Sequence, residues 1–135
     1  MSAGLVILVR YATSRRSAIS YVDGFLIPVA PGKRDEYLAV ACKMAAIFKE
    51  FGATRVVEAW GDDVAVGKVT DFRRAVAAQG DEGVVFSWIE YPSKEIRDAA
   101  SKKVMEDPRM KEMGVDMPFD GKRVVFYGFV RILDQ

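Results

Sequence analysis

The stretch that decides the fold is residues 83–91, which read GVVFSWIEY. Successive side chains of an extended chain point to opposite sides, so this stretch has two faces. One face carries Val85 and Ile89, whereas the other carries Phe86 and Trp88. Neither face is polar throughout, and we therefore expect both faces of this strand to be covered.

Three further stretches show the same two-sided pattern, and strands are expected at residues 20–29, 54–60 and 123–133. Across the four strands, one set of alternating positions, the aliphatic register, is almost wholly oily: Val22, Leu26, Val57, Ala59, Val85, Ile89, Phe126 and Val130. The other set, the aromatic register, mixes rings with charge: Tyr21, Asp23, Phe25, Glu58, Trp60, Phe86, Trp88, Glu90, Tyr127, Phe129 and Arg131.

Two helices are expected between these strands. Residues 33–51 place apolar side chains at steps of three and four, which predicts one buried stripe: Tyr37, Ala41, Met44, Phe48 and Phe51. Gly52 suits the end of this helix because glycine adopts left-handed backbone without strain. Ser93 is expected to cap a second helix, and Pro108 to begin a short turn after it.

The resulting order is β-α-β, a long connection over residues 61–82, and β-α-β. This is the ferredoxin-like arrangement, an α+β fold with both helices on one face of an antiparallel sheet. We expect the aliphatic register to face the helices, which leaves the aromatic register uncovered within one subunit. A bare apolar face of that size is unusual in a monomer, so a homodimer is predicted.

The composition limits the organisation of the chain. Half of its 135 residues are hydrophobic, which is enough for the core of one domain. That domain is expected over residues 20–135, with residues 1–19 as an extension outside the fold. The alternative for the extension is an additional edge strand over residues 5–11.

The charges and the single cysteine limit the partners and the compartment. Twenty Lys and Arg and 19 Asp and Glu are interspersed and give a net charge of +1, which favours neither nucleic acid nor an anionic membrane. No apolar run has the length that a bilayer requires. Cys42 is the single cysteine, so an intrachain disulfide is excluded and a cytoplasmic location is expected.

The chain contains no histidine, which excludes Ser–His–Asp catalysis and the usual zinc sites. No cofactor is expected. Carboxylates that face an apolar lumen are candidates for acid–base chemistry, which points to Asp23 and Glu58, with Tyr127 as a third candidate. The same face predicts a ligand pocket: Phe25, Trp60, Phe86, Trp88, Glu90 and Arg131. The alternative is that each carboxylate pairs with an arginine, such as Arg131 or Arg123, or lies at the solvent-exposed rim of the dimer.

Other candidate sites have simpler interpretations. Asp62 and Asp63 could bind Mg²⁺ or Ca²⁺, but adjacent aspartates after a strand are typical of turns, and no metal site is expected. Cys42 adjoins the apolar stripe and is expected to be a buried, inert thiol. An RNA-binding module shares the β-α-β-β-α-β order, but residues 83–91 lack its basic signature, and carboxylates on the face would repel phosphates.

Seven blocks of the sequence, in one order, carry a resemblance to a known family: residues 21–25 (YVDGF), 60–63 (WGDD), 72–76 (FRRAV), 85–89 (VFSWI), 91–93 (YPS), 107–110 (DPRM) and 117–123 (MPFDGKR). From residue 20 to residue 133 the chain resembles the bacterial YbaA-like family, a domain of unknown function. The resemblance implies a dimeric α/β-barrel in which two ferredoxin-like sheets face each other. It brings no established activity, ligand or catalytic residue. Arg73 departs from the family's usual proline, which affects the local turn.

Three functions remain open at this point. The first is a cytoplasmic homodimer that binds a small apolar or aromatic molecule in the barrel interior. The second is a cofactor-independent enzyme of the monooxygenase or isomerase kind. The third is a structural or interaction dimer without a ligand. A roomy cavity with a carboxylate aimed into it favours the first two, whereas a lumen filled by Trp60, Phe86 and Trp88 favours the third.

Overall fold

A computed structural model of the chain describes residues 20–114 and 116–135. The expected extension, residues 1–19 with the alternative strand at residues 5–11, lies outside the described residues. The elements in chain order are β1 (Tyr21–Val29), α2 (Arg34–Glu50), β2 (Arg55–Trp60), α3 (Phe72–Ala75), β3 (Gly83–Tyr91), α4 (Lys94–Glu106), α5 (Pro108–Met113), the 3₁₀ turn η1 (Gly121–Arg123) and β4 (Val125–Val130).

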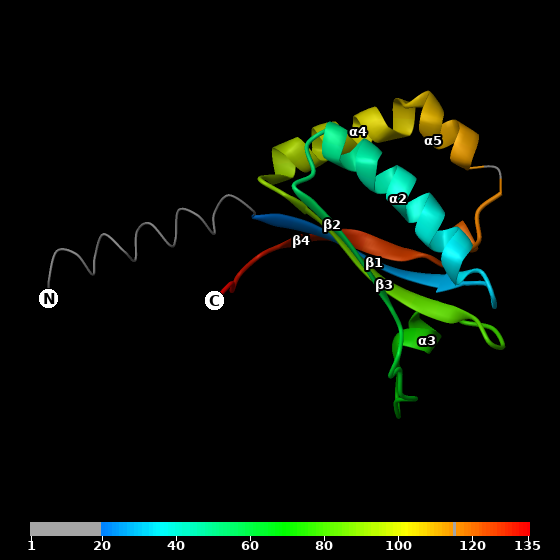
Figure 1. The fold of residues 1–135 in the computed structure, drawn as a ribbon. Coiled ribbons are helices and arrows are strands. Elements are labelled where there is room, and N and C mark those ends of the chain that lie inside the picture. Colours follow the sequence, from blue (N-terminus) through cyan, green and yellow to red (C-terminus); the bar gives the residue numbers. More distant parts are fainter. Residues whose placement is uncertain (1–19, 115) are drawn as a thin grey trace, which may run out of the picture.

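The four strands form one antiparallel sheet in the order β2-β3-β1-β4. Helices α2, α4 and α5 cover one face of this sheet, and the short helix α3 lies on the opposite side (Figure 1). This is the predicted ferredoxin-like α+β fold. Among the described residues, the structure contains no helix with the length and apolarity needed to span a bilayer.

Local sequence signals place the ends of the helices where they were expected. Ser93 accepts a hydrogen bond of 3.2 Å from the backbone N–H of Ile96, and this cap begins α4. Pro108 begins α5, and Gly52, which follows the C-cap residue Phe51 of α2, has a φ of +129°. By contrast, β4 is shorter than predicted at both ends, and η1 includes Arg123, the first residue of the expected strand.

The pairing register shows which side chains share a face. Phe25 lies opposite both Ser87 and Phe126, and Glu58 also lies opposite Ser87. Glu58 is hydrogen-bonded to Tyr37 of α2, so these side chains face the helices. We call this side of the sheet the inner face. It comprises the odd-numbered positions of β1 and β3 and the even-numbered positions of β2 and β4.

The predicted distribution of the two registers was therefore wrong for β1 and β2. Their aromatic-register members face the helices: Tyr21, Asp23, Phe25, Glu58 and Trp60. Their aliphatic-register members face away: Val22, Leu26, Val57 and Ala59. The physical reason is that α2 presents aromatic side chains, Tyr37 and Phe48, to the sheet. Aromatic side chains such as Phe25 therefore pack against this helix no less favourably than aliphatic side chains would.

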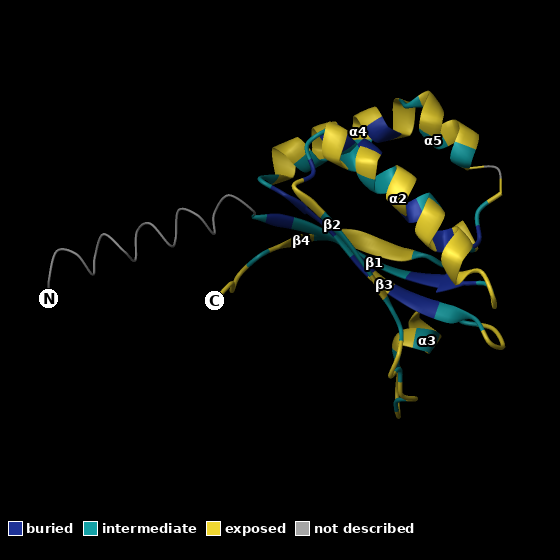
Figure 2. Cartoon of the chain, viewed as in Figure 1, coloured by how far each residue is buried: buried dark blue, intermediate teal, exposed yellow. Residues whose placement is uncertain are grey.

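The opposite side of the sheet, the outer face, remains strongly apolar. Its larger apolar members include Val22, Leu26, Val57, Phe86, Trp88, Val125, Tyr127 and Phe129. Tyr127 is 76% exposed and Phe129 is 62% exposed, and β4 is exposed along most of its length (Figure 2). Helix α3 contacts this face through Phe72, whose ring lies edge-on to Phe86 at 6.2 Å.

Candidate functional site

A cavity of about 270 Å³ lies between α2 and the inner face. Five aromatic rings line it: Phe25, Tyr37, Phe48, Phe119 and Phe126. The Phe25 and Phe126 rings stack at 5.9 Å, and the Tyr37 and Phe119 rings meet edge-on at 6.0 Å. Phe126 is 55% exposed, so the lining reaches solvent at β4.

Three polar side chains meet within this apolar lining. Tyr37 donates a hydrogen bond of 2.6 Å from Oη to Oε2 of Glu58. The hydroxyl side chain of Ser87, which lies opposite Glu58 in the β2–β3 pairing, also interacts with the Glu58 carboxylate. Tyr37 and Ser87 are both buried, whereas Glu58 is half-buried. The cavity thus combines an apolar body with one localised polar group, which is the usual composition of a small-molecule site.

The surroundings of Glu58 change its protonation. Burial raises the pKa of the Glu58 carboxyl, and the hydrogen bonds from Tyr37 and Ser87 oppose that rise only in part. Burial also raises the pKa of Tyr37, as does the neighbouring Glu58, so the Tyr37 hydroxyl keeps its proton. The arrangement supplies one carboxyl able to exchange a proton and one hydroxyl that stays a donor.

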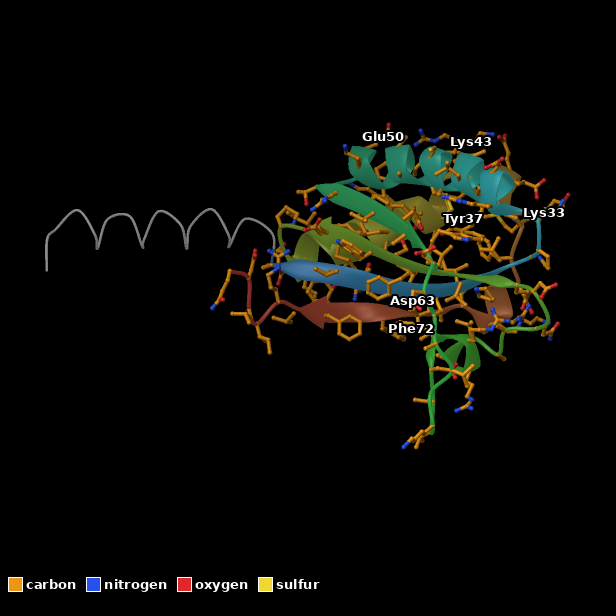
Figure 3. The ribbon with its side chains drawn as sticks, turned by 60° about the horizontal axis from the view of Figure 1, so that its bottom comes forward. Lys33, Tyr37, Lys43, Glu50, Asp63 and Phe72 are labelled. Carbon is orange, nitrogen blue, oxygen red and sulfur yellow. The ribbon has the colours of Figure 1, made fainter. Side chains whose placement is uncertain are left out.

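The local sequence explains why these groups converge. Tyr37 belongs to the apolar stripe of α2 and lies on the side of the helix that faces the sheet, whereas Lys43 and Glu50 lie on its solvent side (Figure 3). Ser87 alternates with Val85 and Ile89 along β3, so it shares their buried face. The antiparallel pairing of β2 with β3 then places Glu58 opposite Ser87.

Of the three predicted acid–base residues, Glu58 alone lines the cavity. Asp23 lies on the inner face but forms an ion pair of 3.1 Å with Arg97 of α4. Burial raises the pKa of Asp23, and Arg97 opposes this rise. Tyr127 lies on the outer face, largely exposed. The structure therefore does not bring Asp23, Glu58 and Tyr127 together.

The residues of the predicted ligand pocket are also divided between two faces. Phe25 lines the cavity, and Trp60 shares the inner face, where the guanidinium of Arg34 lies 5.7 Å from its ring. Phe86, Trp88 and Glu90 lie on the outer face. The prediction that these side chains share one surface was wrong, because β1 and β2 present the opposite register to the one expected.

The alternative interpretation of the carboxylates, pairing with arginine, is confirmed for two of them. Glu90 is buried and lies 3.3 Å from the guanidinium of Arg131, as well as 3.6 Å from that of Arg55. Asp23 pairs with Arg97. Arg123, the other suggested partner, instead forms a bidentate ion pair with Glu82, in which Nη1 and Nη2 donate to Oε1 and Oε2 at 2.7 and 2.8 Å.

Two further predictions concern single residues outside the cavity. Asp62 and Asp63 are exposed, and no cluster of three or more His, Cys, Asp or Glu side chains able to hold a metal occurs in residues 20–114 and 116–135. Cys42 was expected to be buried, which is wrong: it is exposed. It follows the stripe residue Ala41 by one position, and this rotation turns it toward solvent.

Two residues of the site were not singled out from the sequence. Tyr37 was assigned to the apolar stripe only, and Ser87 appeared only within the resemblance. A usable signal existed for Ser87, because it is the one small hydroxyl within the otherwise apolar and aromatic run 84–89. A buried hydroxyl requires a hydrogen-bond partner, and such a partner marks the polar end of a cavity.

Comparison with solved structures identifies a similar fold. The chain is similar to a dimeric ferredoxin-like protein from an uncultured marine organism, whose crystal structure matches with a TM-score of 0.53 at 10% identity. The match covers 91% of this chain and 96% of that one. At this identity the similarity concerns the fold alone.

Comparison of sequences identifies the family. The chain is 61% identical over 117 residues to the uncharacterized protein YbaA of Escherichia coli K12, and equally to that of Shigella flexneri. Each match covers 87% of this chain and 100% of the relative. Residues 20–121 match the model of the family described as proteins of unknown function, DUF1428. The chain therefore belongs to the DUF1428 family, together with YbaA.

Proposed function

We propose that this protein is a homodimer in which each subunit binds a small apolar or aromatic molecule in the cavity between α2 and the sheet. The observation that carries the proposal is the cavity itself, about 270 Å³ of space lined by rings with a carboxylate and two hydroxyls at one place. A mostly apolar cleft with a few convergent polar groups is the usual form of a small-molecule site. The lining reaches solvent at Phe126, so the cleft is open to a molecule from outside.

The location differs from the one expected in the barrel interior. The expected site lay between the two sheets of a dimer, whereas the cavity lies between the sheet and a helix of one subunit. The proposed ligand therefore does not require the dimer interface as its wall. The two parts of the proposal, the ligand and the dimer, can be tested separately.

The outer face supports the homodimer. Phe86, Tyr127 and Phe129 are all about half exposed or more, and the neighbouring Val22, Leu26 and Val57 are only partly shielded. Covering such a face removes apolar area from water, at roughly 25 cal/mol per Å². The solved protein of the same fold is described as dimeric. Two outer faces packed together would form the α/β-barrel.

The single cysteine fits the proposed cytoplasmic location.

A second candidate function is proton-transfer catalysis without a cofactor. The specific observation is the raised pKa of Glu58, which brings a carboxyl closer to the pH at which a general acid or base works best. In such an enzyme Glu58 would exchange the proton, and Tyr37 would hold a substrate oxygen. Glu58→Gln would then abolish turnover of a bound substrate, and Asp23→Asn would leave it. Turnover that survives Glu58→Gln would contradict this function.

The binding proposal is tested with 2-phenylethanol, a neutral aromatic alcohol small enough for the cavity, by ligand-observed NMR. We expect saturable binding with a Kd of about 1 mM or tighter. Ala45→Phe, which places a ring in the cavity, should abolish this binding. The matched control is Ala46→Phe, one position along α2 on its exposed side, which should leave binding unchanged. Equal binding by both variants would contradict the cavity as the site.

A further inference from the structure

Glu58 differs from the other shielded carboxylates of the described chain in its electrostatic partner. Each of the others lies 2.7 to 3.5 Å from an arginine nitrogen; these pairs are Asp23 with Arg97, Asp71 with Arg74, Glu82 with Arg123, Glu90 with Arg131, and Asp107 with Arg109. Glu58 has only the hydroxyls of Tyr37 and Ser87, and forms no ion pair with any residue that the structure describes. The Glu58 carboxylate therefore has hydrogen-bond partners but no cationic partner among the described residues.

The remainder of the cavity is also suited to positive charge. Among the described residues that line it, Glu58 is the one charged side chain. The other walls include five aromatic rings, whose faces carry the negative end of the ring quadrupole. A cation placed over such faces is attracted, and more strongly where water is excluded. Arg123, near the lining residue Gly121, is engaged by Glu82 and Asp120.

We propose that the occupant of this cavity is an organic amine in its protonated form. Its ammonium group would pair with the Glu58 carboxylate, and its aromatic or short aliphatic body would pack among the rings. The inference rests on the proposed function, because it names the class of molecule that the cavity binds. The ammonium supplies the positive partner that an arginine supplies to every other shielded carboxylate of the described chain.

The same electrostatics disfavour an anionic ligand. A carboxylate or phosphate would meet the unbalanced charge of Glu58 with no cationic side chain beside it among the described lining residues. Burial of two like charges at close range is costly. Burial raises the pKa of Glu58, and no cationic side chain of the described residues acts to lower it. A neutral alcohol can still bind through the hydroxyls, but without the gain from charge pairing.

Three probes with the same ring test the inference: 2-phenylethylamine as the cation, 2-phenylethanol as the neutral molecule and phenylacetate as the anion. Isothermal titration calorimetry at neutral pH should show the amine binding about tenfold tighter than the alcohol, and the acid binding most weakly. In Glu58→Gln the amine should fall to the affinity of the alcohol. Because Glu58 lines the cavity, the circular dichroism spectrum of the variant, and not its alcohol binding, shows whether it remains folded.

The outcomes separate this inference from the proposed function. Equal affinities of amine and alcohol in the wild-type protein would overturn the amine inference and leave the binding site standing. A preference for the amine that persists in Glu58→Gln, or in the filled cavity of Ala45→Phe, would also overturn it, because the cation would then bind elsewhere. Failure of all three probes to bind would overturn the proposed function as well. If Glu58→Gln does not fold, the wild-type comparison and Ala45→Phe still decide the question.

Discussion

The hydroxyl of Tyr37 and the carboxylate of Glu58 lie 2.6 Å apart, and this hydrogen bond joins α2 to β2 across the edge of the cavity. The two residues are 21 positions apart in the chain. Because Tyr37 is held within the buried stripe of α2, its hydroxyl holds Oε2 of Glu58 in one position. The other carboxylate oxygen keeps its capacity to accept a bond from an incoming molecule.

Tyr37→Phe should change both the stability and the titration of Glu58. Loss of one hydrogen bond costs about 1 kcal/mol of unfolding free energy. The pKa of Glu58 should rise further, because the hydrogen bond from Tyr37 stabilises the ionised form. Urea denaturation and a ¹³C NMR titration of the carboxyl measure the two effects. Tyr127→Phe is the control, since Tyr127 lies on the outer face, away from Glu58, and an equal effect in both variants would contradict the assigned role.

Asp23→Asn should destabilise the fold without affecting the cavity. The substitution removes the carboxylate that pairs with the largely shielded guanidinium of Arg97 at 3.1 Å, and we expect a loss of about 2 kcal/mol. Asp98→Asn removes the other acidic partner of Arg97, but Asp98 is exposed, so its loss should cost about 0.5 kcal/mol or less. Urea denaturation compares the two variants. A larger cost for Asp98→Asn would refute this ranking.

Glu82→Gln should make stability less sensitive to acid. Hydrogen bonds from Arg123 lower the pKa of Glu82 from 4.5 to about 2. A carboxyl with a lowered pKa in the folded state stabilises the fold above its unfolded pKa, and this contribution is lost as the pH falls through about 2. The variant should therefore be less stable than wild type at pH 7, and the difference should shrink steadily below pH 4.5. A difference that stays constant down to about pH 2 would contradict the ion pair's contribution.

Phe129→Glu should dissociate the proposed dimer. Phe129 lies on the outer face, and a carboxylate buried there between two subunits would have no partner. Light scattering after size-exclusion chromatography should give twice the chain mass for wild type and the single mass for the variant. Leu38→Glu, on the exposed side of α2, is the matched control and should remain dimeric. A monomeric wild-type protein at micromolar concentration would exclude the dimer.

The ends of the helices could be predicted from the sequence because the signals are local. The stripe of α2, the cap at Ser93 and the proline at Pro108 act within one helical turn, so they identify each element without knowledge of the fold. The topology followed from the order of the elements. The same reasoning correctly placed Val85 and Ile89 of β3 on the helix-facing side.

The faces of β1 and β2 could not be assigned in the same way. Alternation identifies the buried face when the other face is polar, but here both faces are apolar. The choice between Phe25 and Leu26 as the inward residue depends on how α2 packs, and this is tertiary information. The cavity was beyond prediction for a related reason: it depends on the separation of α2 from the sheet, and Tyr37 and Glu58 meet only after both have been placed.

Chemical-shift mapping of ¹⁵N-labelled protein titrated with 2-phenylethanol tests the binding site most directly. The account predicts saturable shifts of the backbone amides of Ala41 in α2 and of Ser87 and Ile89 in β3, which are distant in the chain but line the same cavity. It also predicts small shifts for Val125 and Tyr127 on the outer face. Shifts confined to the outer face, or no saturable shift around the cavity, would show that the space between α2 and the sheet is not a binding site.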